Sequence, residues 1–270
     1  MPGRRQTPQT ESAGDRGMID LHCHLLPGVD DGPETMEQAV AMARAAHDAG
    51  IQKAIVTPHL HLGRYENDLN SIRIAAHAFS AELKHRQIPL QISYAAEVRI
   101  CPELTELVEN GTAPFVGELD GKKILLLEFP HSHIPTGSDK MVEWLLGHGV
   151  RPMIAHPERN KDVIRKFDKI LPFVEMGCLM QVTAGSVAGR FGPAARQRAN
   201  DLLEHGFVHV LASDAHNLDV RRPELEMGRV AAERLIGVAA SWALVRETPH
   251  AISRSRFSEV DLDSAVEDVS

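Results

Sequence analysis

The chain has 270 residues, 43% of them hydrophobic, and a formal net charge of -8. An acidic chain without a stripe of Lys and Arg argues against binding to nucleic acid, which requires a basic surface. No segment approaches the roughly 18 consecutive apolar residues of a membrane span. We therefore expect a globular protein with neither membrane insertion nor a nucleic-acid partner.

The two ends differ in composition from the middle of the chain. Residues 1–17 are polar and lack the apolar core of a signal peptide, which predicts a disordered lead-in and a cytoplasmic protein. Residues 258–270 carry five acids and no base, and we interpret them as an acidic tail. Residues 18–257 contain no Gly-, Pro- or Ser-rich linker, which predicts a single domain. Nothing in the sequence indicates an oligomeric state.

Apolar and β-branched runs recur along the chain and predict seven strands buried on both faces. They cover residues 18–22, 53–59, 90–97, 123–129, 151–156, 178–184 and 208–216. Helical spacing is found between them, at residues 34–50, 67–86, 138–147, 160–176, 193–205 and 222–236. Residues 101–121 are less regular and predict a short helix followed by a long loop.

This alternation of strands and helices predicts the α/β class, with parallel strands joined by right-handed crossovers. We expect the seven strands to close into a barrel. A doubly wound open sheet is the competing architecture, but the sequence lacks a GxGxxG after the first strand and has no GxxxxGK[ST].

Six of the seven predicted strands end on side chains that can bind a metal ion. These are His22, His24, His59, Glu97, Glu128, His156, Asp214 and His216, with Asp31 in the loop after the first strand. The carboxyl ends of barrel strands converge on one face, where active sites lie. Residues two apart also point to the same side of a strand. We therefore expect the whole set to meet in one pocket.

Five histidines and four carboxylates exceed the three or four protein ligands that one zinc ion needs. Two or three divalent ions explain the set better, because so many carboxylates would repel one another without cations between them. Nitrogen and oxygen ligands without thiolate favour manganese, iron or zinc. Manganese is our first choice, with iron, zinc, magnesium and cobalt as alternatives. A single histidine at a strand end is more often structural, so the prediction rests on the number of such residues in register.

Three arginines follow the predicted strand ends. Arg159 lies three residues after His156, and Arg221 and Arg222 lie in the loop after His216. Guanidinium groups bind phosphate oxygens in a forked geometry. A surface ion pair is an equally good interpretation from these positions alone.

Three cysteines, Cys23, Cys101 and Cys178, are far apart and show no CxxC spacing, which favours reduced thiols. We interpret all three as small buried apolar residues. None is followed by Arg six positions later, so a cysteine-based tyrosine phosphatase is excluded.

The segments "DLHCHLLPGVDDG", "VTPHLHLGRY", "AAEV", "LLLEFP", "IAHPER" and "LASDAHNLDVRRP" together resemble the polymerase and histidinol phosphatase (PHP) superfamily. Within it they resemble the manganese-dependent protein-tyrosine phosphatases of bacterial capsule and exopolysaccharide loci, the CpsB/CapC type. The resemblance covers about residues 18–257. It implies a distorted seven-stranded, TIM-like barrel of the PHP type, with a trinuclear metal site.

The resemblance also implies roles for individual residues. The nine strand-end and loop residues named above would be the metal ligands, and no ligand position is missing. Arg159 would bind phosphate, Arg221 is a weaker candidate for the same role, and Asp20 would orient a ligand histidine. The acid that protonates the leaving group is left open between His156 and a bound water.

By resemblance the substrate is phosphotyrosine on a protein, a tyrosine autokinase that controls polysaccharide export. The residues alone support phosphoester hydrolysis and no finer statement. One alternative is a small-molecule phosphatase of the same superfamily, such as histidinol phosphatase. Another is a non-catalytic metal-binding module that regulates a kinase through its surface.

Overall fold

The computed structural model describes residues 17–257, so the expected lead-in (apart from Gly17) and the acidic tail lie outside the described residues. The strands are β1 Met18–Cys23, β2 Ile51–Val56, β3 His59–Leu60, β4 Gln91–Tyr94, β5 Glu97–Arg99, β6 Gly117–Leu119, β7 Lys122–Glu128, β8 Val150–Ala155, β9 Leu179–Thr183 and β10 Val210–Ala212.

The helices cover the sheet from outside and add a terminal group that the sequence did not predict. The α-helices are α1 Met36–Asp48, α2 Leu69–His85, α3 Leu104–Glu109, α4 Ser138–Gly147, α5 Lys161–Arg165, α6 Leu171–Glu175, α7 Ala184–Val187, α8 Gly192–Glu204, α9 Glu226–Ile236, α10 Val238–Trp242 and α11 Thr248–Ser253. Short turns complete them: η2 Pro157–Arg159, η3 Phe167–Lys169 and η5 Arg254–Arg256 are 3-10 helices, and η4 Ala243–Glu247 is a π-helix.

All seven predicted strand regions are strands, but two of them are broken. The second is divided into β2 and β3 at residues 57–58, and the third into β4 and β5 at residues 95–96. The expected long loop is wrong in part, because β6 pairs antiparallel with β7. Asp120 and Gly121 connect the two with positive φ angles of 53° and 74°, as a tight two-residue hairpin requires.

The strands follow the order of a barrel. By hydrogen bonding, β1, β2 and β4 form one parallel sheet, and β3, β5, β7, β8, β9 and β10 form a second one that also holds β6. Bonds from His24 N to Ala215 O (2.9 Å) and from Asp214 N to His22 O (2.8 Å) join the end of β1 to the residues after β10. The architecture is therefore a distorted seven-stranded barrel of the TIM type, as predicted, with interruptions in its ladder.

Two separate apolar clusters confirm that the sheet has an inside and an outside. The inner cluster draws side chains from every strand region, among them Leu21, Ile55, Leu126, Met153 and Val210. The outer cluster packs the other face of the strands against the helices. A strand that contributes to both is buried on both faces, which explains the continuous apolar runs in the sequence.

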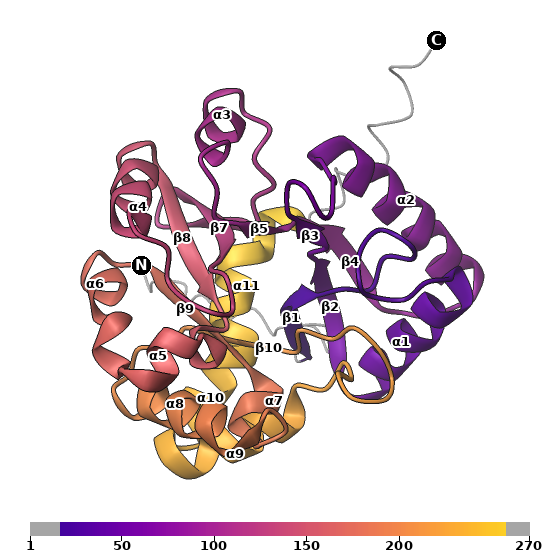
Figure 1. Cartoon of the computed structure of the whole chain (residues 1–270). Helices are drawn as coiled ribbons and strands as arrows, with labels where there is room; N and C mark the ends of the chain where they lie inside the picture. The colour runs from indigo at the N-terminus through magenta and orange to yellow at the C-terminus, as the bar shows by residue number, and fades with distance from the viewer. Residues whose placement is uncertain (1–16, 258–270) are drawn as a thin grey trace, which may run out of the picture.

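Figure 1 shows how the helices surround the strands. Helices α1 and α2 pack beside β2 and β4, and α4 packs on β8 on the other side of the barrel. Helix α11 packs against β1 and β6, and its Ile252 joins the inner cluster. Gly117 of β6 lies so close to the Ile252 carbonyl that a side chain would not fit there. The terminal helices therefore close one end of the barrel.

Predicted helix bounds agree closely with the structure except in one region. The expected helix at 160–176 is divided into α5, η3 and α6. Lys166 takes an extended conformation with φ of -144°, and a new helix, α6, begins at Leu171 with Pro172 in its first turn. In the described part of the chain, no helix is both long enough and apolar enough to cross a bilayer.

Candidate metal centre

The structure brings together all nine side chains that the sequence proposed as metal ligands. Nitrogen and oxygen atoms within 4.8 Å of one another form four overlapping groups. The groups are His24, Asp31, His59 and His216; His22, His24 and Asp214; His22, Glu97 and His156; and His59, Glu97 and Glu128. Because His22, His24, His59 and Glu97 each belong to two groups, the cluster fits several neighbouring ions better than one.

Strand alternation places three of these side chains. Glu97, Glu128 and Asp214 each lie two residues beyond an apolar residue of the inner cluster, so they face the barrel axis directly above it. The breaks at residues 57–58 and 95–96 come just before His59 and Glu97. The ends of the broken strands therefore carry ligand candidates, as do the ends of the continuous ones.

The two histidines of the first strand face the same pocket because the strand alternation is interrupted. Leu21 belongs to the inner cluster, so strict alternation would turn His22 outward. A register shift between Asp20 and Cys23 changes the face, and His22 and His24 both point inward. Their Nε2 atoms are 3.2 Å apart, while Cys23 packs in the outer cluster. Both histidines of the HxH motif therefore face the pocket, as predicted, and they do so because of this register shift.

Backbone strain positions His156 and also acts at Asp214. His156 has φ of 33° and Asp214 has φ of 51°, in a left-handed region that non-glycine residues rarely occupy. His156 precedes η2, and this turn aims its Nε2 at Glu97 Oε1, 2.7 Å away. Strained residues of this kind persist where surrounding contacts hold them, and they are common at functional sites.

Partners of the histidine rings fix which nitrogen faces the pocket. Gln181 Oε1 lies 2.8 Å from His22 Nδ1, and Asp30 Oδ2 lies 2.6 Å from His24 Nδ1. The Asp214 carbonyl lies 3.0 Å from His216 Nδ1. In all three rings the Nδ1 side is held, so Nε2 is left for a metal, the arrangement common to metal-binding histidines.

Asp20 does not orient a histidine ring, so that expectation is wrong. Its Oδ1 accepts from the backbone N–H groups of His22 (3.2 Å) and Ser213 (3.1 Å), and its Oδ2 accepts from the Ser213 hydroxyl. Asp20 therefore ties the end of β1 to the end of β10. Burial raises its pKa to about 6 despite these hydrogen bonds.

The cluster concentrates charge in a buried space. Burial and the neighbouring Glu97 raise the pKa of Glu128 to about 7. Burial lowers the pKa of His59, but contacts to Asp31 and Glu97 outweigh it and raise that pKa to about 9. Burial together with Arg159 lowers the pKa of His156 to about 3. Such opposed shifts within one pocket mark it as a candidate functional site.

Divalent cations fit this pocket because many of its atoms lack a hydrogen-bond partner. The buried atoms without a hydrogen bond include His59 Nδ1, Glu97 Oε2, Asp214 Oδ1 and His216 Nε2. Buried polar atoms without partners are costly, and each exception calls for an explanation. A hard or borderline cation coordinated by imidazole and carboxylate supplies one.

Two arginines lie over the cluster, as their positions in the sequence suggested. One guanidinium nitrogen of Arg159 lies 2.6 Å from Asp214 Oδ2, and one of Arg221 lies 2.5 Å from the same oxygen. The guanidinium of Arg159 also stacks over the ring of Phe191, 4.8 Å from its centroid. Arg222 instead pairs with Glu224 at 3.0 Å, so it fits the alternative of a surface ion pair.

Several residues at the site were not identified from the sequence. Arg99 pairs with Glu128 at 2.9 Å, and its position two residues after Glu97 was the available signal. Gln181 interrupts the apolar run of the sixth strand, a signal of the same kind. Glu158 is fully buried and accepts a hydrogen bond from Thr183 N at 3.1 Å, which ties the turn before Arg159 to the end of β9.

The cysteines take no part in the cluster. Cys23 and Cys178 are buried as predicted, whereas Cys101 is only partly buried, so the prediction is wrong for that residue. Burial raises the pKa of Cys178 to about 12, and it raises the pKa of Cys23 as well. Thiols with raised pKa values are poor nucleophiles.

Known proteins share this fold and much of this sequence. Residues 18–254 match the family model described as capsular polysaccharide synthesis, CpsB/CapC. The tyrosine-protein phosphatase YwqE of Bacillus subtilis is 35% identical over 220 residues, covering 82% of this chain and 85% of that protein. The putative tyrosine-protein phosphatase CapC of Staphylococcus aureus is 31% identical over 204 residues, covering 76% and 79%.

Solved structures agree with the sequence comparison. A crystal structure from a study of YwqE from Bacillus subtilis and CpsB from Streptococcus pneumoniae, described as unique metal-dependent tyrosine phosphatases, superimposes with a TM-score of 0.82. It is 33% identical and covers 88% of this chain and 95% of its own. The phosphotriesterase homology protein of Escherichia coli, 14% identical over 88% of this chain and 99% of its own, has a TM-score of 0.56 and shares the fold.

Proposed function

Because the chain belongs to the CpsB/CapC family, we propose that it is a metal-dependent phosphatase that hydrolyses phosphotyrosine on a protein. The observation that carries the proposal is the cluster of nine imidazole and carboxylate side chains beneath two arginines. The family match to residues 18–254 supports residues 18–257 as one catalytic domain.

The nine residues would hold two or three divalent ions, with manganese as first choice. The donor set is imidazole and carboxylate without thiolate, which suits manganese, iron or zinc. Bound ions of this kind supply Lewis acidity and lower the pKa of a water molecule at the site. Gln181 and Asp30 would keep the histidine rings in the tautomer that presents Nε2.

The arginines would bind the phosphate group. Arg159 is held between the ring of Phe191 and Asp214, with its side chain only 11% exposed, so its guanidinium is already ordered. Arg221 reaches the same carboxylate from the loop after β10. Two guanidinium groups converging on one point can neutralise the charge on phosphate oxygens as the bond to the phenolate breaks.

His156 fits a ligand role better than that of a general acid. Burial and Arg159 lower its pKa to about 3, so the ring carries no dissociable proton to give at neutral pH. Its Nε2 also faces Glu97 inside the cluster. We therefore assign the proton for the leaving phenolate to a bound water, the other candidate.

The natural substrate that we propose is a tyrosine autokinase of capsule or exopolysaccharide synthesis, encountered in the cytoplasm. The family description supports the process, and the names of the relatives support phosphotyrosine as the group removed.

Phosphate release from a phosphotyrosyl peptide tests the activity. Purified protein is assayed with added manganese and, in parallel, with a chelator, and histidinol phosphate and a phosphoseryl peptide are run beside it. We expect manganese-dependent release from the phosphotyrosyl peptide, abolished by the chelator. Release from histidinol phosphate alone would contradict the proposal and favour a small-molecule phosphatase, and no release from any substrate would favour a non-catalytic module.

A further inference from the structure

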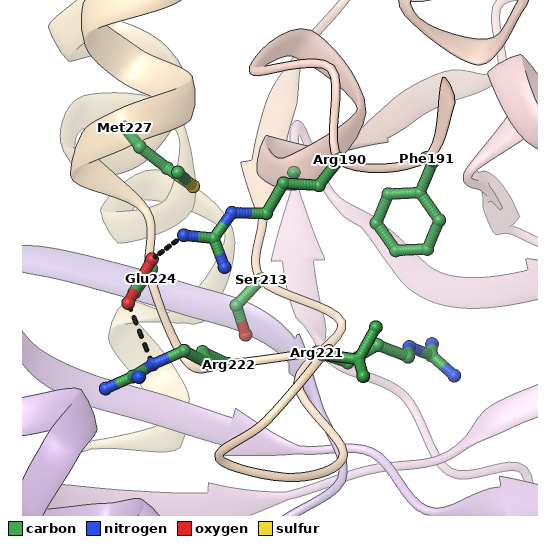
Figure 2. Close-up of a pocket in the computed structure, with 9 residues that line it drawn as sticks. Arg190, Phe191, Ser213, Arg221, Arg222, Glu224 and Met227 are labelled. Atoms are coloured by element: carbon green, nitrogen blue, oxygen red, sulfur yellow. Dashed lines mark hydrogen bonds and ion pairs between the residues drawn. The ribbon is translucent and has the colours of Figure 1, made fainter.

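A pocket with an excess of positive charge opens beside the metal centre. It lies between the segment that joins α7 to α8 and the loop before α9 (Figure 2). We call it the arginine pocket and define it by Arg190, Phe191, Arg221, Arg222 and Glu224. The guanidinium groups of Arg190 and Arg222 face the single carboxylate of Glu224, so this part of the lining carries a net positive charge, while the Arg221 guanidinium turns away from Glu224 (Figure 2).

The arginine pocket shares its wall with the phosphate-binding end of the site. Arg221 lines the pocket, and its guanidinium reaches Asp214 Oδ2 at 2.5 Å. Phe191 lines it too, and its ring carries the guanidinium of Arg159. A ligand in the pocket would therefore lie directly beside a phosphate group bound by Arg159 and Arg221.

Two of the arginines already hold a carboxylate. Glu224 Oε2 lies 2.9 Å from a guanidinium nitrogen of Arg190, and Glu224 Oε1 lies 3.0 Å from Arg222 Nε (Figure 2). The side chains of Arg190 and Arg222 are 37% and 46% exposed, so solvent reaches them. Each guanidinium has five N–H donors, and these contacts with Glu224 use one on each. Donors are thus left for a second anionic group.

The arginine pocket is close to Arg159, because Phe191 lines the pocket and contacts the Arg159 guanidinium. Neighbouring residues of an extended chain are about 3.3 Å apart along its axis, and alternate side chains point to the same side. A substrate with its phosphotyrosine under Arg159 would bring a nearby side chain over the arginine pocket. Val220 at the rim is 74% exposed and offers an apolar surface beside the charges.

We propose that the arginine pocket binds an acidic side chain of the protein substrate, one to three residues from the phosphotyrosine. The pocket would make a carboxylate near the phosphotyrosine a specificity determinant. This inference rests on the proposed function, because it requires a phosphotyrosyl peptide as substrate.

The test compares matched peptides on matched variants. Phosphotyrosyl peptides carry Glu or Gln at each of the three positions on either side of the phosphotyrosine, and kcat/KM is measured for each pair. The Glu/Gln ratio cancels any change that affects both peptides. For one charge-assisted contact at a partly exposed site, we expect a ratio of about threefold to tenfold at one position or more.

Four variants test whether the preference for Glu over Gln depends on the arginine pocket. Arg190→Gln and Arg222→Gln should each lower the ratio toward one, because they remove a guanidinium from the pocket. Glu224→Gln should raise it, because it removes the carboxylate that competes for the same donors. Arg234→Gln is the matched control: it removes the same charge near the other end of α9, about 12 Å along the helix from Glu226, and should leave the ratio unchanged.

Three results would overturn the proposal while leaving the proposed function intact. The first is a wild-type ratio near one at every position. The second is a Glu/Gln ratio that Arg190→Gln and Arg222→Gln leave unchanged, as the control Arg234→Gln does. The third is a lower ratio in Glu224→Gln, which would mean that the arginine variants act by loosening the loop. Failure of the wild type to release phosphate from every phosphotyrosyl peptide would remove the proposed function and this inference together.

Discussion

Two layers of side chains lie one above the other inside the barrel, and they differ sharply in chemistry. The lower layer is the inner apolar cluster, and the upper layer is the candidate metal centre. The same strands supply both: Leu126 is followed two residues later by Glu128, and Ala212 by Asp214. Along one strand, a step of two residues therefore leads from a side chain that stabilises the fold to a side chain of the candidate metal centre.

The largest effect is expected from removing an upper-layer side chain that belongs to two of the overlapping groups. His22→Ala should lose metal and phosphatase activity together. Activity should fall more than about 100-fold, because removing a metal ligand lowers activity more than removing a group that only orients a ligand. Metal content by elemental analysis and phosphate release are measured on the same sample. His85→Ala, a change at a side chain 78% exposed, is the control. Full activity with a full metal content in His22→Ala would contradict the assignment.

A loss of activity without loss of metal is expected at the arginine above the upper layer. Arg159→Ala should keep its metal and lose about 100-fold to 1000-fold in kcat/KM, the range for removing one preorganised group that stabilises transition-state charge. Inorganic phosphate should also inhibit the variant more weakly. Arg165→Ala, at a side chain 70% exposed, controls for loss of the charge. Unchanged kinetics would show that Arg159 makes only a structural ion pair.

The lower layer should respond in stability and not in chemistry. Leu126 is fully buried two residues before Glu128, so Leu126→Ala should lower the free energy of unfolding by about 2 to 5 kcal/mol. Below the unfolding transition the variant should still bind metal in full. Denaturant titration with metal analysis of the folded protein measures both, and exposed Lys122→Ala on the same strand is the control. If the variant keeps its stability but loses its metal, the separation of the two layers does not hold.

Much of the upper layer could be predicted because its side chains follow the strand period. Apolar runs ending on His, Asp or Glu located eight of the nine candidates, Asp31 being in a loop, and the seven runs gave the order of the strands. What failed depends on local backbone geometry. The register shift that turns His22 inward and the left-handed φ of His156 both depend on contacts with neighbouring strands. No periodicity in the sequence encodes such irregularities.

Predictions from the sequence were less accurate outside the site, again because local backbone geometry and contacts decide the outcome. The break before His59 was missed although Pro58 inside the run was a signal for it. The break before Glu97, at Ala95 and Ala96, has no such signal. Hairpin strand β6 was missed although Asp120 and Gly121 form a strong turn signal. The role of Asp20 was wrong, since its sequence position beside His22 cannot distinguish a contact with the backbone from one with the ring.

The smallest effect is expected on β9, the strand whose end carries no ligand candidate. Gln181 lies two residues beyond Leu179 of the inner cluster, in the place where other strands carry Glu97, Glu128 or Asp214. Its Oε1 holds His22 Nδ1 at 2.8 Å, so Gln181→Leu should weaken metal affinity about 10-fold to 100-fold, the range for losing a group that orients a ligand.

The matched change at this position is Gln181→Glu, which keeps an acceptor for His22 Nδ1 and should retain most of the affinity. Calorimetric titration of manganese into protein stripped of metal measures both variants. Equal affinities for wild type and Gln181→Leu would show that the orientation of His22 is set by strand geometry alone. A loss in Gln181→Leu that Gln181→Glu restores would show that the upper layer needs a hydrogen-bond acceptor at this strand end to hold the His22 ring in place.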